Sequence, residues 1–430
     1  MDRVVVIGAG HAGVQVADSL RAGGYTGAVT VVGEEAGLPY QRPPLSKDYL
    51  GPGGPGEPLP LRGDRFFADC GIDLRTGLAA TGLDLAARSV ALSDGSVLDY
   101  EALVLATGAA NRTLPGADLD GVHHLRTLTE AQVLRGALDR AESVVVVGAG
   151  FIGLELAAVA RKRGRGVTVL ETANRVLGRA VSLAMSEYLA SAHRRMGVDL
   201  RLEEGVDSFE SVDGRVLAVA STRGEVYPAD LVLVGIGALP RTELAAAAGL
   251  QVDNGIVVDA HLRTSDPHVY AVGDCATFPS VHASTRVRLE SVQNATDQAR
   301  HVAAAILGSR APYAALPWFW SQQGPIRLQI AGLTRPGDET AVCGEVGTGK
   351  FSVLAFDQGQ LTAVESVNKP ADHMAARKAL AGDCPLTPND VTGPAFNLKV
   401  YAENLALPLH EPLRVLSPHA AQASQPRVRW

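Results

Sequence analysis

The sequence predicts an α/β fold in which one parallel-sheet domain is inserted into another, followed by a small α+β domain. Two observations support the insertion. A strand, a glycine-rich turn and a helix occur twice, at residues 4–17 and 144–157, and a strand that ends in small residues follows each copy, at 101–108 and 229–237. After Leu316 the pattern changes to alternating strands and one helix, which is typical of an α+β domain. A length of 430 residues suits two or three domains.

The expected domain limits follow from these patterns. The segments 1–113 and 239–316 form the first parallel-sheet domain, 114–238 forms the inserted one, and 317–410 forms the α+β domain. Residues 411–430 are rich in Pro, Ala, Ser and Gln, and we expect them to form a flexible tail.

Composition argues against several classes of protein. The formal net charge of −7 is unlike that of a general nucleic-acid-binding protein, and a hydrophobic content of 46% is enough for sizeable cores. The N-terminus has no signal peptide and no apolar run reaches the ~18 residues of a membrane span, so we expect a cytoplasmic protein without a membrane anchor. The four scattered cysteines form no C-x-x-C pair and no metal-ligand spacing, so we expect buried thiols and no metal site.

The first glycine-rich turn reads Gly-Ala-Gly-His-Ala-Gly at residues 8–13, between an apolar strand and a helical stretch. In a dinucleotide-binding unit Gly8 makes the tight turn, Gly10 lets the backbone approach a pyrophosphate, and Gly13 lets helix and strand pack closely. The N-terminus of the helix offers free N–H groups to the phosphates. Glu34 ends the next strand about twenty residues later, where such a unit places its ribose-binding acid.

The second copy repeats each part, with Gly148, Gly150 and Gly153 at the three glycine positions and Glu171 at the end of the next strand. One such motif could be a turn without a ligand, but two in the same context predict two Rossmann-like units and two dinucleotides. The natural pair is a flavin that stays bound and a nicotinamide cofactor that exchanges. Glu171 would accept a hydrogen bond from a free 2′-hydroxyl and repel a 2′-phosphate, which favours NADH over NADPH, although Arg175 could weaken this preference.

Two further strand ends suit the same cofactors. The small residues at 106–108 let the chain pass close to a bound cofactor, or end an ordinary buried strand. Asp274 follows Gly273 at the end of a short strand, where a carboxylate could accept hydrogen bonds from a polyol such as a ribityl chain. The residues alone explain Asp274 equally well as a helix N-cap.

Several longer segments are more specific than either glycine motif: LPYQRPPLSKDYL at 38–50, GAGFIGLELA at 148–157, VDNGIVVDAHLRTSDPHVYAVGDCA at 252–276, LESVQNATDQAR at 289–300 and WFWS at 318–321. On these segments the chain resembles the FAD-dependent NADH:ferredoxin reductases of oxygenase systems, the group of putidaredoxin reductase and the biphenyl-dioxygenase-type reductases. The resemblance covers the chain nearly to its C-terminal tail and implies a glutathione-reductase-like fold.

The glycine motifs and the resemblance together imply two sets of cofactor-binding residues. The FAD set consists of Gly8, Gly10, Ala12, Gly13, Glu34, Arg42, Lys47, Arg126, Asp274, Val292 and Trp320. The NADH set consists of Gly148, Gly150, Ile152, Gly153, Glu155, Glu171, Gly237 and Glu290. Four of these residues are expected where the reaction takes place: Lys47, Glu155, Glu290 and Trp320.

The resemblance also implies the reaction. A hydride passes from NADH to FAD, and single electrons then pass to a two-iron two-sulfur ferredoxin that feeds a haem-thiolate monooxygenase or a Rieske dioxygenase. Lys47 would stabilise negative charge on the flavin, and Trp320 would cover the flavin plane. Glu155 and Glu290 would position the carboxamide of the nicotinamide or pair with Lys47. The sequence leaves a monomer and a homodimer open.

The chain departs from the family pattern at three places. Residues 322–324 read Gln-Gln-Gly where an acid, Gln and Tyr are common after the Trp-Ser pair. Arg241 stands where Asn is usual, and residues 110–112 read Ala-Asn-Arg in place of Arg-Pro-Arg. These departures concern contacts near the flavin edge and the partner surface, and they remove no cofactor-binding element.

Two alternative functions fit the same glycine motifs. Disulfide or peroxide reduction needs a redox cysteine beside the flavin, and residues 38–50 contain none. An NADH-binding flavoprotein that acts as a redox sensor and interaction protein would show slow turnover. Basic clusters at 161–165 and 193–195 could steer an acidic partner such as a ferredoxin, or form solvated helix faces.

Overall fold

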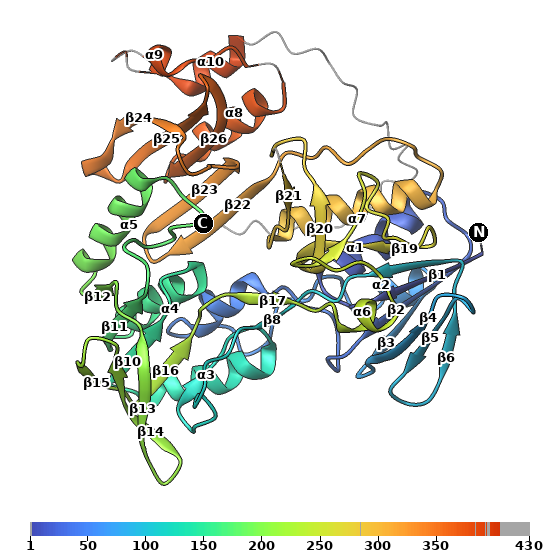
Figure 1. Ribbon diagram of the computed structural model, residues 1–430, viewed down its shortest axis with the longest axis horizontal. Coiled ribbons are helices and arrows are strands. Elements are labelled where there is room, and N and C mark those ends of the chain that lie inside the picture. Colours follow the sequence, from blue (N-terminus) through green and yellow to red (C-terminus); the bar gives the residue numbers. More distant parts are fainter. Residues whose placement is uncertain (1, 284, 383, 392, 394–395, 405–430) are drawn as a thin grey trace.

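The computed structural model of the chain describes residues 2–404 except 284, 383, 392, 394 and 395. The predicted tail, 411–430, lies outside these residues, as do residues 405–410. Three five-stranded sheets organise the described chain, two of them parallel and the third antiparallel (Figure 1). Within the described part of the chain, every helix is too short or too polar to cross a membrane.

The first parallel sheet combines strands from both sides of the predicted insertion. Its order is β19 (Val269–Ala271), β7 (Ala102–Leu105), β1 (Arg3–Ile7), β2 (Ala28–Gly33) and β3 (Ile72–Thr76). Consecutive valines in β1 are buried, as expected for a central strand whose two faces are both covered. Helix α1 (His11–Ala22) packs on this sheet, and α7 (Val292–Ile306) lies beside α1 (Figure 1).

The second parallel sheet repeats this arrangement with the second glycine-rich turn. Its order is β12 (Asp199–Leu202), β11 (Gly166–Glu171), β10 (Ser143–Val147), β16 (Leu231–Val234) and β9 (Val122–His123). Helix α4 (Phe151–Lys162) takes the place that α1 has in the first sheet, and α3 (Leu128–Arg140) and α5 (Leu183–Arg195) complete this part. Thr127 and Glu130 form a capping box that starts α3.

A two-stranded ribbon carries the chain between the two parallel sheets. Strand β8 (Ala109–Asn111) pairs antiparallel with β17 (Ala238–Pro240), and the ribbon crosses the middle of the molecule (Figure 1). Three small sheets lie outside the parallel ones: β4 (Ala80–Asp84), β5 (Ser89–Leu92) and β6 (Val97–Asp99); β13 (Val206–Val212), β14 (Arg215–Ser221) and β15 (Val226–Pro228); β18 (Ile256–Val257), β20 (Ala276–Pro279) and β21 (Arg286–Val287).

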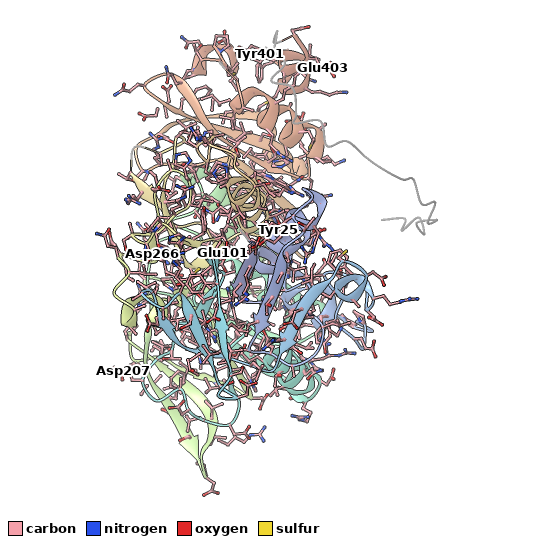
Figure 2. The ribbon with its side chains drawn as sticks, turned by 90° about the vertical axis from the view of Figure 1, so that its right-hand side faces the viewer. Tyr25, Glu101, Asp207, Asp266, Tyr401 and Glu403 are labelled. Atoms are coloured by element: carbon pink, nitrogen blue, oxygen red, sulfur yellow. The ribbon has the colours of Figure 1, made fainter. Side chains whose placement is uncertain are left out.

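The third large sheet is antiparallel. Its order is β22 (Trp318–Gln323), β23 (Ile326–Gly332), β26 (Gln360–Val367), β25 (Lys350–Asp357) and β24 (Glu339–Glu345), with helices α8 (Pro370–Leu380), α9 (Pro388–Val391) and α10 (Leu398–Asn404). The edge strand β22 packs against α4 and α7, so it touches both parallel-sheet parts. Figure 2 shows Tyr401 and Glu403 of α10 at one end of the molecule and Asp207 of β13 toward the other. The predicted fold class is confirmed, whereas the exact domain limits stay a prediction.

Candidate active site

One cavity, with a volume of about 1660 Å³, is lined by residues of all three large sheets. Both glycine-rich turns open on it, and Trp320 of β22 faces it. Every site residue predicted from the sequence lines this cavity except Gly13 and Gly153, the third glycines of the two turns. The two predicted sets of cofactor-binding residues therefore share one space.

In the first glycine-rich turn, the fold itself requires glycine at two positions, whereas only a bound ligand would require it at the third. Gly8 has φ +113°, and a Cβ there would lie 2.1 Å from the carbonyl oxygen of Ala106. A Cβ on Gly13 would lie 1.8 Å from the carbonyl oxygen of Gly8. A Cβ on Gly10 would meet nothing within 4 Å, so the protein itself does not need a glycine there. Open space beside Gly10 fits the close approach of a pyrophosphate.

The second turn follows the same geometry. Gly148 has φ +100°, and a Cβ there would lie 2.6 Å from the carbonyl oxygen of Gly235. A Cβ on Gly153 would lie 2.1 Å from the carbonyl oxygen of Gly148, while Gly150 is less crowded, with its nearest atom at 3.8 Å. Neither α1 nor α4 has a side-chain N-cap, so the first N–H groups of both helices are available to phosphates. Both cradles fit a dinucleotide.

The acids that follow the two turns have different surroundings. Glu34 forms an ion pair with Arg241, the residue at which the chain departs from the family pattern. Glu171 Oε2 accepts from the N–H of Ala149 at 2.7 Å, which ties this acid to the second glycine-rich turn. Arg175 donates to backbone carbonyls of its own loop, including that of Val181 at 2.8 Å. Its guanidinium is therefore engaged by its own loop.

The centre of the cavity holds a buried ion pair. Lys47 Nζ lies 2.7 Å from Glu155 Oε2, and the side chains are only 12% and 2% exposed. The hydroxyls of Ser46 and Ser321 also donate to this carboxylate, at 2.5 and 2.7 Å. Lys47 Nζ also lies 5.1 Å from the ring centroid of Trp320. The buried charges are thus both paired and hydrogen-bonded, which offsets the cost of removing them from water.

The structure decides between the two acids considered as partners of Lys47. The pair with Glu155 is confirmed. The pair with Glu290 is wrong, because the carboxylate of Glu290 accepts instead from Arg288 Nη1 at 2.6 Å. Glu290 follows β21 and lines the same cavity, so a role toward the nicotinamide stays a prediction for this residue.

Two arginines and an acid form a second polar group in the cavity. Arg126 Nη2 lies 2.6 Å from Asp274 Oδ2, and Arg42 Nη1 donates to the carbonyl of Arg126 at 2.6 Å. Asp274 lies inside a short 3-10 turn whose N-cap is Val272, so the N-cap explanation of Asp274 is wrong. Guanidinium groups beside a carboxylate suit a pyrophosphate and a polyol.

Sequence reasoning missed three residues of this site. Ser46 and Ser321 hold Glu155, but they are separated from it by more than one hundred positions, and a lone serine gives no signal of such a contact. His11 stands inside the first glycine motif. Burial, together with the charge of Arg42, lowers the pKa of His11 to about 4, so its ring is neutral at physiological pH.

The cysteines contribute no side chain to the lining of this cavity. Among the described residues that line the cavity, none is a cysteine, and all four thiols of the chain are free. Burial raises the pKa of the Cys275 thiol, which makes it a poor nucleophile. The arrangement gives no support to the disulfide-reductase alternative. Within the described part of the chain, no cluster of His, Cys, Asp or Glu could hold a metal ion.

Three side chains of the two basic clusters make internal contacts, whereas Lys162, Arg194 and Arg195 are exposed. The side chain of Arg163 is 8% exposed and donates to the carbonyl of Leu50 at 2.7 Å. Arg161 donates to the carbonyl of Met196, and His193 is fully buried. These three side chains hold elements together, so neither explanation offered for the clusters, partner steering or a solvated helix face, applies to them.

A cavity shared by two dinucleotide cradles is the mark of a nicotinamide-dependent flavoprotein, because hydride transfer requires contact between the two rings. The chain belongs to the pyridine nucleotide-disulphide oxidoreductase family, whose model matches residues 2–299. A second model, described as reductase C-terminal, matches residues 318–402. The family implies FAD and NAD(P)H as cofactors.

Several known proteins are similar to the chain over nearly its whole length. Rhodocoxin reductase from Rhodococcus erythropolis is 50% identical over 399 residues, which cover 92% of this chain and 93% of the relative. The ferredoxin reductase for the CYP199A2 system from Rhodopseudomonas palustris has a TM-score of 0.91 at 46% identity, covering 94% of this chain and all of that one. The covalent complex of putidaredoxin reductase with putidaredoxin matches with a TM-score of 0.90 at 42% identity, covering 94% and 98%.

Proposed function

We propose that this protein is an FAD-containing reductase that transfers electrons from NADH to a two-iron two-sulfur ferredoxin, which in turn feeds an oxygenase. The observation that carries the proposal is the single cavity in which both dinucleotide cradles meet the Lys47–Glu155 pair and Trp320. FAD, when bound, supplies the conversion of a two-electron hydride donor into one-electron transfers.

The residues on each side of the cavity suit one of the two cofactors. The first glycine-rich turn, Arg126 and Asp274 would hold FAD, with the open space at Gly10 receiving its pyrophosphate. The second turn, with Glu171 at its edge, would hold the nicotinamide cofactor. This assignment follows the family resemblance, and the orientation of both cofactors follows from the two helix N-termini.

The central residues orient and shield rather than transfer protons. The Lys47 ammonium, fixed by Glu155, would stabilise negative charge on a bound flavin. Trp320, whose ring centroid lies 5.1 Å from Lys47 Nζ, would cover the flavin ring and shield it from water. No acid, base or nucleophile of the protein is required for a hydride to pass.

NADH is the proposed donor because of Glu171. Its carboxylate stands at the end of β11 beside the second glycine-rich turn, and a carboxylate there accepts from a free ribose hydroxyl and repels a 2′-phosphate. Arg175 does not counter this effect, since its guanidinium is engaged by its own loop.

A ferredoxin partner is supported by the similarity to a chain solved in covalent complex with putidaredoxin. An oxygenase downstream is supported by the similarity to a ferredoxin reductase of the CYP199A2 system. The proposal includes both a haem-thiolate monooxygenase and a Rieske dioxygenase as the downstream oxygenase.

The test is NADH-driven reduction of cytochrome c by the purified holoprotein, with and without an added two-iron two-sulfur ferredoxin. Strong stimulation by the ferredoxin and little activity with NADPH are expected. If several ferredoxins give no stimulation while NADH still changes the flavin spectrum, the reductase proposal is wrong and the redox-sensor alternative replaces it.

A further inference from the structure

A row of hydrogen-bonded, buried polar side chains leads from helix α5 to the ion pair of Lys47 and Glu155. It runs from His193 on α5 through Gln323 and Ser321 on β22 to Glu155 on α4. The first three residues are 0% exposed and Glu155 is 2% exposed. Buried polar groups are costly unless they are hydrogen-bonded, so each member of such a chain needs a partner.

Each neighbouring pair in the chain is within hydrogen-bond distance. His193 Nε2 lies 2.8 Å from Gln323 Oε1, and Gln323 Nε2 lies 3.2 Å from Ser321 Oγ. Ser321 Oγ lies 2.7 Å from Glu155 Oε1, and the other oxygen of Glu155 receives Lys47 at 2.7 Å. The chain of hydrogen bonds thus connects the inserted part and the third sheet to the ammonium group of Lys47, which belongs to the first part.

The carboxylate determines the direction of every bond. An ionised Glu155 only accepts, so the Ser321 hydroxyl must donate to it. The Ser321 oxygen can then only accept, so Gln323 must present its NH₂ group to Ser321 and its carbonyl to His193. His193 must therefore donate from Nε2. Burial lowers the pKa of His193, so its ring is neutral and has a single N–H to give.

We propose that Gln323, oriented by His193, is a positioning residue for the reaction. The row of donors that ends on Glu155 Oε1 holds this carboxylate so that Oε2 faces Lys47, and it thereby fixes the ammonium beside Trp320. The consequence for electron transfer rests on the function proposed above. The hydrogen-bond directions do not.

The departure from the family pattern at Gly324 fits this arrangement. Gly324 has φ +60° in the turn after β22, and a Cβ there would lie 3.2 Å from Met196 Sδ, at the end of α5. The turn therefore lies against the end of α5, the helix from which His193 reaches Gln323.

The first test needs no turnover. The ¹⁵N NMR signals of the His193 ring in the holoprotein are expected to show the proton on Nε2 at neutral pH. A proton on Nδ1 would overturn the row of donors, whatever the variants do. This measurement is also independent of the ferredoxin, so it separates a failure of this inference from a failure of the proposed function.

The second test compares variants by stopped-flow reduction of the bound flavin by NADH and by the flavin midpoint potential. Gln323→Met keeps roughly the same volume and removes both the carbonyl and the NH₂ group of the side-chain amide. It is expected to slow flavin reduction about three- to tenfold, to lower the midpoint potential and to leave the KM for NADH within about twofold. The matched control is Gln322→Met, because among the described residues the Gln322 side chain donates to the carbonyl of Gly324 at 2.6 Å and bonds none of His193, Ser321 and Glu155; it should change neither quantity.

A rescue distinguishes positioning from packing. His193→Gln retains a donor near the position of Nε2, so it should keep flavin reduction close to that of the wild type. His193→Phe removes the donor and should behave like Gln323→Met. Equal behaviour of the two His193 variants, or an effect of Gln323→Met below about twofold in a folded holoprotein, would overturn the proposal. Should the variants not fold, the NMR result decides it.

Discussion

Arg241 forms an ion pair with Glu34, although 207 positions separate the two residues in the sequence. The chain reaches Arg241 immediately after β17, and its backbone N–H donates to the carbonyl of Gly108. The pair therefore links the segment that leaves the inserted part after β17 to the end of β2. Its side chains are 44% and 61% exposed, which decides how much it can contribute.

Arg241→Asn, which restores the residue usual in the family, should change FAD affinity by less than about fivefold. Exposed ion pairs contribute little because water screens them. Arg126→Asn is the contrasting variant, because it breaks the more buried pair with Asp274 and should weaken FAD binding at least tenfold, or about 1.4 kcal/mol. Fluorescence titration of the cofactor-free protein with FAD measures both. Equal losses in the two variants would contradict the assignment.

Gly10→Ala and Gly13→Ala should fail in different ways. The first places a methyl group in open space with ordinary backbone angles, so the FAD-free protein should keep its Tm within about 2 °C while FAD binding weakens tenfold or more. The second drives a methyl group into the carbonyl of Gly8 and should cost more than ~2 kcal/mol of stability. Tm and FAD titration separate the two cases. A Gly10→Ala variant with unchanged FAD affinity would show that no phosphate lies there.

Glu171→Ser should shift the ratio of kcat/KM for NADH over that for NADPH toward NADPH by about tenfold, since the repulsion of a 2′-phosphate is lost. Arg175→Met should leave this ratio within about twofold and lower the Tm, because the Arg175 guanidinium serves backbone carbonyls of its loop. Steady-state kinetics with both nucleotides test the pair. A large change of the ratio in Arg175→Met would mean that the guanidinium leaves its loop when the nucleotide binds.

Acid should destabilise the fold through His373. Its ring is 1% exposed, packs against Trp318, and has no hydrogen-bond partner for either nitrogen among the described residues. Burial, and next the charge of Arg377, lowers the pKa of His373 to about 4. The unfolded chain binds this proton below pH 6.5 and the folded chain only near pH 4, so stability is lost as the pH falls through that window.

His373→Phe should remove that loss. The difference in unfolding free energy between pH 7 and pH 4.5 is expected to shrink by about 2 kcal/mol, as followed by Tm at each pH. His268→Phe, at a half-buried loop position, is the control and should leave the difference unchanged. A wild-type difference that survives in His373→Phe would assign the acid sensitivity to other groups.

The sequence predicted the parts of the site that depend on local geometry. The glycine turns follow from a strand, a turn and a helix within a few residues, so the positions of Gly8 and Gly148 could be read directly. Pairing of Lys47 with an acid came from the family resemblance, but the choice of Glu155 depends on how α4 faces the turn after residue 42. That choice is a matter of packing between distant segments.

The contacts made by α5 could not be predicted for the same reason. In the sequence, His193 precedes two arginines and resembles the start of an exposed basic face. In the fold, the turn after β22 covers it and Gln323 becomes its partner. A helix shows which residues share a face, but only the third sheet decides which face it covers.

The ribbon of β8 and β17 contains both connections between the inserted part and the rest of the chain. Entry and exit points lie side by side, with Ala109 opposite Pro240, so a short linker could close the gap if the residues between them were excised. Insertion of one dinucleotide-binding unit into a loop of a second, related unit would produce this arrangement. It also means that a donor-binding module from a related enzyme could be exchanged at these two residues, provided that it kept counterparts of Glu155 and Arg163, which contact the rest of the chain.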